Sequence, residues 1–202
     1  MATVKTVARD PDSKKRLILA AARRMLVKRG FQDIVLDDIA HEAGVAKGTL
    51  FLHFKDKEAL FSAVFADIVD GLGLELESLP KTGLAGRELL VATAKVVLNH
   101  FDHSRDFMAQ AGTGRFPGCG DKSCGKLLEK FRLNHARMGA IIAQASKDGG
   151  KSVADMSFAV GAFFSLCRTL TMRKVIEGHD RPLEREAESV VSFFLGGSGV
   201  MV

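Results

Sequence analysis

The sequence contains no tryptophan and no tyrosine, so the 14 phenylalanines among its 202 residues supply all of its aromatic packing. Its three cysteines, Cys119, Cys124 and Cys167, are too few and too unevenly spaced for a disulfide-stabilised domain. The longest uncharged apolar stretch worth testing as a membrane span, 156–167, is shorter than the ~20 residues that cross a membrane. The first residues also lack the apolar segment of a secretory signal. We therefore expect a cytoplasmic protein that makes no contact with a membrane.

Sequence motifs of common enzymes are absent as well. The chain has no phosphate-binding glycine motif, no HExxH zinc pair and no nucleophile elbow. We therefore expect neither an enzyme nor a resident cofactor or metal ion.

The residues that are present suit an ordinary globular protein with a basic N-terminal part. Apolar residues make up 47% and charged residues 26% of the chain, which is typical of folded domains. The net charge is +5, and residues 1–60 hold 12 Lys and Arg against 8 Asp and Glu, whereas the rest of the chain is nearly balanced. This asymmetry favours an N-terminal region that faces nucleic acid.

The spacing of apolar residues predicts an all-α fold, because no segment shows the alternation of a strand. A first helix is expected over 13–29, ended by Gly30, followed by short helices over 36–43 and 47–54. A fourth helix is expected to start near Lys57 and to fade by Gly73. Further helices are expected over 84–101, 104–112, 123–147, 152–177 and 182–195.

The two short helices and the turn between them have the arrangement of a helix-turn-helix. Ala40 is small where the two helices cross, and Gly44 tolerates the conformation of the turn. The spacing turns Leu50 and Phe54 inward, and Val45 is expected to join them in a small core. The second short helix is then free to enter the major groove of DNA.

Many residues of this segment stand at fixed spacing: Gly30, Ile39-Ala40, Ala43-Gly44-Val45, Lys47-Gly48-Thr49-Leu50, His53-Phe54 and Lys57-Glu58-Ala59-Leu60. This set resembles the signature of the TetR (tetracycline-repressor-like) family. The resemblance implies a three-helix N-terminal DNA-binding domain and a C-terminal helical bundle for ligand binding and dimerisation. The expected parts are a flexible arm over 1–12, the DNA-binding domain over 13–56, and the ligand-sensing and dimerisation domain over 57–202.

The resemblance also implies which side chains meet DNA. A lysine and the amides of a helix N-terminus neutralise backbone phosphates, and a threonine hydroxyl bonds to a base edge or a phosphate. The predicted DNA-binding residues are Lys47, Gly48, Thr49, Phe51, His53 and Lys57.

Two departures from the family pattern lie within the same segment. Phe51 replaces a usual tyrosine, so a phosphate contact gives way to apolar contact, for instance with a thymine methyl group. Val35 lies in the segment 34–36 where the family favours threonine, so the hydroxyl cap of the second helix is absent. Asp37 and Asp38 are expected to interact with the helix dipole, although they would repel a nearby phosphate.

The function implied is that of a repressor that binds a palindromic operator in double-stranded DNA as a homodimer and is released by a small, largely hydrophobic inducer. Apolar walls with one polar group suit such a ligand. The predicted ligand-binding residues are Phe101, Phe107, Met108, Phe131, His135 and Met138, with an ordinary hydrophobic core as the alternative interpretation.

The last two predicted helices are candidates for the dimer interface. Paired across a two-fold axis, they would form a four-helix interface. The helix over 152–177 brings Phe158, Gly161, Ala162, Ser165 and Thr169 near one face, and the last helix has Leu183, Ala187, Val190, Val191 and Phe194 in register for burial.

Two other functions remain open at this point. Cys119 and Cys124 lie in a glycine-rich loop and would, as a redox pair or together with His135 at a metal ion, make a thiol- or metal-responsive regulator. The chain is alternatively an architectural DNA-binding protein without a ligand.

Overall fold

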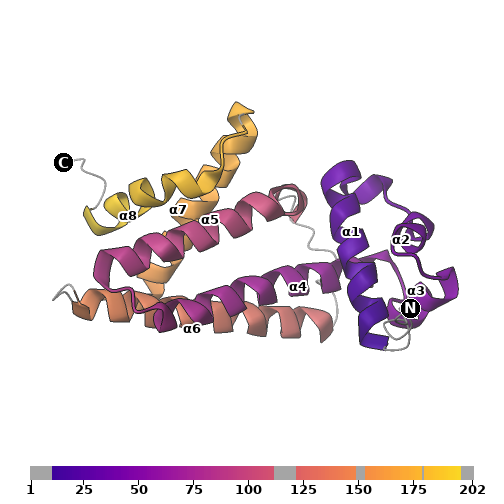
Figure 1. Cartoon of the computed structure of the whole chain (residues 1–202), viewed down its shortest axis with the longest axis horizontal. Helices are drawn as coiled ribbons and strands as arrows, with labels where there is room; N and C mark the ends of the chain where they lie inside the picture. The colour runs from indigo at the N-terminus through magenta and orange to yellow at the C-terminus, as the bar shows by residue number, and fades with distance from the viewer. Residues whose placement is uncertain (1–10, 112–121, 149–152, 179, 197–202) are drawn as a thin grey trace, which may run out of the picture. The chain divides into compact units, whose positions relative to one another are not determined.

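The computed structural model describes residues 11–111, 122–148, 153–178 and 180–196. All regular structure within these ranges is helical, as the sequence predicts (Figure 1). The elements are α1 (Pro11–Asp33), α2 (Leu36–Glu42), α3 (Lys47–His53), α4 (Lys57–Ser78), the 3-10 turn η1 (Leu79–Thr82), α5 (Gly86–Ala111), α6 (Lys122–Asp148), α7 (Met156–Glu177), the 3-10 turn η2 (Leu183–Glu186) and α8 (Ala187–Gly196).

Two predicted helix ends are wrong, because the helices continue through glycine. α1 runs past Gly30 to Asp33, and α4 runs past Gly73 to Ser78. A glycine inside a helix costs about 1 kcal/mol relative to alanine. Buried residues follow both glycines, Ile34 in the first case and Leu76 in the second, so the burial of apolar surface outweighs that cost.

α5 is one continuous helix and not the two that the sequence predicts over 84–101 and 104–112. The polar residues at the expected break are held inside the fold. The Asp102 carboxylate accepts a hydrogen bond from Lys174 of α7, and the side chain of Ser104 is buried. The residues between the two predicted helices, Asp102 and His103, include no glycine or proline that would end a helix.

The chain forms two compact units, divided within α4 after Asp67 and within α5 after Arg105. Among the described residues, the first unit contains α1, α2, α3 and the first half of α4, with 106–111 and 122–125. Its buried core includes Ile18, Ala21, Ala22, Met25, Leu26, Ile34, Ile39, Ala40, Leu50, Phe54, Leu60, Phe61 and Val64.

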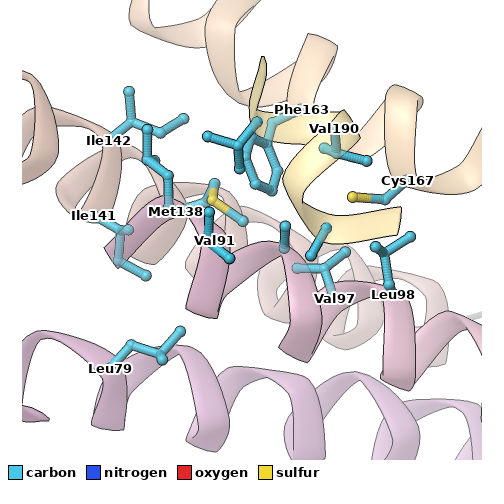
Figure 2. Close-up of a cluster of buried hydrophobic side chains, with 14 of the residues drawn as sticks. Leu79, Val91, Val97, Leu98, Met138, Ile141, Ile142, Phe163, Cys167 and Val190 are labelled. Atoms are coloured by element: carbon cyan, nitrogen blue, oxygen red, sulfur yellow. The ribbon is translucent and has the colours of Figure 1, made fainter. Parts of the chain in front are cut away.

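The second unit has a larger hydrophobic core, built from α4 to α8. Figure 2 shows part of it, with side chains of α6, α7 and α8 gathered about α5. Cys167 lies inside this core, where burial raises the pKa of its thiol to about 12. This cysteine therefore remains a neutral packing residue near pH 7 and not a nucleophile.

A buried ion pair joins three elements of the second unit. Lys174 Nζ of α7 lies 2.7 and 2.8 Å from the two carboxylate oxygens of Asp102 of α5. The backbone N–H of Leu183 in η2 donates to the same carboxylate at 3.4 Å. Only 5% of the Lys174 side chain is exposed, so the pair fixes α7 against α5 in a region of low dielectric.

α4 and α6 meet in the second unit through polar contacts. The buried Asn134 amide donates to the Val69 carbonyl at 2.8 Å, and Arg137 donates to Asn134 Oδ1 at 3.1 Å and to Glu77 at 3.1 Å. A Cβ at Gly73 would lie 2.6 Å from that amide oxygen. A side chain at Gly73 would therefore displace the polar ends of Asn134 and Arg137 from these contacts.

No helix in the part of the chain that the structure describes combines the length and the apolar character needed to cross a membrane.

Candidate nucleic-acid interface

α2, a four-residue turn and α3 form the predicted helix-turn-helix, with ends within one residue of those expected. Gly44 adopts a left-handed conformation with φ of 66°, which favours glycine. On either side of it, the N–H of Ala43 donates to Ile39 at 2.9 Å and the N–H of Val45 donates to Ala40 at 3.0 Å. The turn is thus fixed by backbone hydrogen bonds as well as by a residue suited to it.

The register of α3 is set by two inward side chains. Leu50 is fully buried and Phe54, which follows the helix, is buried as well, as the sequence predicts. The opposite side of α3 is open to solvent: Leu52 is 86% and Phe51 43% exposed. The first unit therefore presents α3 as an uncovered surface.

The six predicted DNA-binding residues lie on α3 and at the first residue of α4. Lys47, Gly48 and Phe51 are exposed, whereas Thr49, His53 and Lys57 are half-buried. A Cβ at Gly48 would meet no atom within 4 Å. The structure thus collects these residues on neighbouring elements of one unit, and their contact with DNA remains a prediction.

Cross-helix ion pairs are the feature of this surface that sequence reasoning missed. Lys47 Nζ lies 2.8 Å from Asp37 Oδ2 and 6.0 Å from the centroid of the Phe51 ring. Arg29 lies 2.9 Å from Asp38 Oδ2. The partners come from different helices, so no i,i+4 spacing marks them. Exposed pairs of this kind contribute about 0–1 kcal/mol to stability, so Lys47 can exchange its carboxylate for another anion.

The N-terminal caps of α2 and α4 differ in how they satisfy the first turn of the helix. Val35 occupies the N-cap of α2 and makes no side-chain hydrogen bond there, in line with the absent hydroxyl. Asp56 lies between α3 and α4. Its carboxylate accepts the N–H of Ala59 at 2.7 Å and thereby caps α4, the helix that follows the recognition segment.

The predicted ligand-binding residues divide into several environments. Met138 is fully buried in the core of the second unit, and Phe101 is packed against that core with its ring 6.4 Å from Phe164. His135 is half-buried, but Phe131 is 40% exposed. The side chains of Phe107 and Met108 lie outside the described residues. A ligand site made by these residues remains a prediction.

Ser104 is a polar residue of this region that the sequence analysis did not single out. It follows Phe101 by three residues on α5 and is buried. Its hydroxyl has no hydrogen-bond partner within the described part of the protein. Such a group costs roughly 1–3 kcal/mol when it stays unpaired, so it is suited to a polar atom of a ligand or to water.

The thiol hypothesis is not tested by the structure. Cys119 and the side chain of Cys124 lie outside the described residues. Among the residues that are described, no group of three His, Cys, Asp or Glu side chains is placed to hold a metal ion.

The two candidate dimerisation helices differ in which face they leave exposed. On α7, four of the five predicted residues, all but the half-buried Ala162, are exposed, and Ile176 is 80% exposed. The predicted residues of α8 are in register for burial, but they pack within the protomer: Leu183, Ala187, Val190 and Val191 are buried, and Phe194 meets Phe163 edge-on at 5.2 Å. The exposed apolar residues of α8 are Phe193 and Leu195.

The sequence of the N-terminal half is similar to that of known transcriptional regulators. Residues 18–64 match the family model described as bacterial regulatory proteins, tetR family. The chain is 33% identical over 103 residues to the uncharacterized HTH-type transcriptional regulator TtgW of Pseudomonas putida, a match that covers 51% of this chain and 75% of TtgW. It is 32% identical over 92 residues to the HTH-type transcriptional activator FasR of Mycolicibacterium smegmatis, covering 46% of this chain and 42% of FasR. Apart from TtgW, the chain spans less than half the length of the first relatives found.

The fold is similar over nearly the whole chain to that of solved regulators. The structure of the transcriptional regulator FadR from Bacillus subtilis, in complex with stearoyl-CoA, superposes with a TM-score of 0.74 at 19% identity, covering 92% of this chain and 99% of that one. These relatives are named as transcriptional regulators and none as an enzyme, which agrees with the absence of catalytic motifs.

Proposed function

Because this chain belongs to the tetR family of bacterial regulatory proteins, we propose that it is a sequence-specific DNA-binding repressor. It binds a palindromic operator as a homodimer and leaves the operator when a small, largely hydrophobic inducer binds the second unit. The observation that carries this proposal is the uncovered surface of α3, where Lys47 and Phe51 project beside the exposed Gly48 from a helix that Leu50 anchors to the core.

The proposed function requires a dimer, because two recognition helices must reach successive major grooves, ~34 Å apart or a multiple of that distance. α7 is 22 residues long and leaves Phe158 at its start and Ile176 near its end exposed. Phe193 of α8 is exposed as well. Exposed apolar residues on the C-terminal helices are suited to pairing with a second copy of the chain.

The inducer is expected to bind in the second unit, beside Phe101. That ring packs against the core and against Phe164, and Ser104 supplies a buried hydroxyl that lacks a partner in the described structure. FadR of Bacillus subtilis, of similar fold, has been solved with stearoyl-CoA, which suggests an acyl chain as one ligand class. A ligand that prefers a conformation unable to span both grooves needs a coupling free energy of only ~1–3 kcal/mol to weaken operator binding roughly 5- to 150-fold.

Replacing Lys47 with alanine tests the proposed function directly. We expect Lys47→Ala to weaken binding to duplex DNA and to reduce the slope of log affinity against log salt by about one, because one phosphate contact is lost. The freed Asp37 carboxylate would add repulsion at the same place. Affinity is measured by a salt titration with labelled DNA, and sedimentation is expected to show an unchanged dimer.

The matched control for that measurement is Lys81→Ala, which removes another exposed lysine from η1 in the second unit. It is expected to leave the affinity for DNA unchanged. An equal loss in both variants would show that Lys47 contributes only to the net charge, and unchanged affinity in Lys47→Ala would contradict the proposed interface.

A charge placed on the exposed face of α7 tests the dimer. Ile176→Glu is expected to shift the protein to monomers, because a carboxylate would be buried without a partner in the interface. Its helical content should stay unchanged, since 80% of Ile176 is exposed in the protomer. Sedimentation velocity measures the shift, with Leu74→Glu on the exposed face of α4 as the control. A dimer that persists in Ile176→Glu would exclude this end of α7 from the interface.

A further inference from the structure

The solvent-facing side of α3 carries two large apolar side chains. Leu52 is 86% and Phe51 43% exposed, on a helix of only seven residues. Their exposure does not reflect poor packing, because Leu50 on the inward side of the same helix is fully buried. Single exposed apolar residues are ordinary on protein surfaces. Two adjacent ones on the recognition helix restrict what that helix can recognise.

The polar side chains of α3 offer little hydrogen-bond readout of bases. Apart from Lys47, the helix, KGTLFLH, contains none of the residues that form paired hydrogen bonds to guanine or adenine, which are Arg, Lys, Asn and Gln. Lys47 is held at 2.8 Å by Asp37, and its ammonium lies 6.0 Å from the Phe51 ring centroid. Thr49 is half-buried. The lysine is thus suited to a phosphate more than to a base edge.

Gly48 leaves space beside the two apolar side chains. On a helix, Phe51 and Leu52 are its i+3 and i+4 neighbours. Gly48 is exposed, and a Cβ at this position would meet no atom within 4 Å. The helix surface next to Phe51 and Leu52 therefore carries no side chain that would hold a base pair away.

From these observations we infer that Phe51 and Leu52 recognise thymine in the operator through its C5-methyl group. This inference rests on the proposed function, because it assigns a base to the surface proposed to meet DNA. The thymine methyl group is the apolar feature of the major-groove edge, and the other bases present donors and acceptors there. Transfer of one methyl group from water to apolar contact is worth ~0.8 kcal/mol, or about fourfold in affinity.

Substitution of uracil for thymine tests the inference, because it removes the methyl group and leaves base pairing intact. The full-length protein is first used to select duplexes from a random library, and each thymine of the selected half-site is then replaced singly by uracil. We expect at least one position per half-site where affinity falls about fourfold. In Leu52→Ser or Phe51→Ala, uracil at that position should cause no further loss.

A control variant and separate outcomes keep this test distinct from that of the proposed function. Leu74→Ser, which changes an exposed leucine of α4, should respond to uracil as the wild type does. If the wild type selects no sequence, the proposed function fails. If it selects a sequence but no uracil substitution lowers affinity, or if Leu52→Ser and Phe51→Ala remain as sensitive as the wild type, methyl recognition by α3 is wrong.

Discussion

Lys174→Met is expected to lower the free energy of unfolding by about 3–5 kcal/mol, which would be a large part of the stability of a typical domain. The substitution keeps the volume of the side chain but removes its charge. The Asp102 carboxylate, bonded at 2.7 and 2.8 Å to Lys174, would then be left inside the protein without a counter-ion. Urea denaturation followed by circular dichroism measures the loss.

An exposed ion pair of the same unit provides the control. Arg87 of α5 lies 2.9 Å from Glu188 of α8, with both side chains well exposed. Arg87→Met should therefore cost no more than about 1 kcal/mol. The double variant Lys174→Met with Asp102→Leu should recover most of the stability that Lys174→Met loses, because no unpaired charge remains. Equal losses in Lys174→Met and Arg87→Met would show that burial does not govern the contribution of the Lys174 pair.

The buried pair of Lys174 and Asp102 illustrates which parts of the fold the sequence could not predict. Periodicity assigns a lysine to a solvated face by default, and the partner of Lys174 lies 72 positions away in the chain. Nothing local marks either residue as buried. The helix break predicted near Asp102 was also wrong, because α5 continues through this residue. Asp102 is held there by Lys174, which is distant in the sequence.

The recognition segment was predictable because its determinants are local. Gly44, the small Ala40 and the spacing of Leu50 and Phe54 all lie within 15 residues of one another, and they placed α2 and α3 within one residue of the observed ends. The family resemblance covers this same part of the chain. The Asp37–Lys47 pair escaped prediction because it depends on the crossing geometry of two helices.

The burial of the apolar face of α8 was predicted, but the surface that covers it was not. The spacing correctly marked Val190 and Val191 for burial, but spacing does not specify which surface covers a residue. In the structure these residues complete the core of their own protomer. The exposed residues that remain for a partner, Phe193 and Leu195, lie at positions that the pattern did not select.

Leu50→Ala is expected to cost about 2–5 kcal/mol and to abolish DNA binding. Leu50 is fully buried and attaches α3, a helix of seven residues, to the core of the first unit. A helix this short is not stable in water without tertiary packing. Hydrogen exchange should show lost protection in α2 and α3, while the helices around Met138 in the second unit keep theirs, because that core does not contain Leu50.

Leu52→Ala is the matched control, since it makes the same substitution two residues away on the same helix. Leu52 is 86% exposed, so its truncation should change stability by less than about 0.5 kcal/mol. Its affinity for operator DNA should nevertheless fall, because Leu52 projects from the surface proposed to meet the bases. The two variants thus separate the inward from the outward side of α3. If Leu52→Ala destabilised the protein as much as Leu50→Ala, the register of α3 would be wrong, and the residues assigned to DNA would belong to the core.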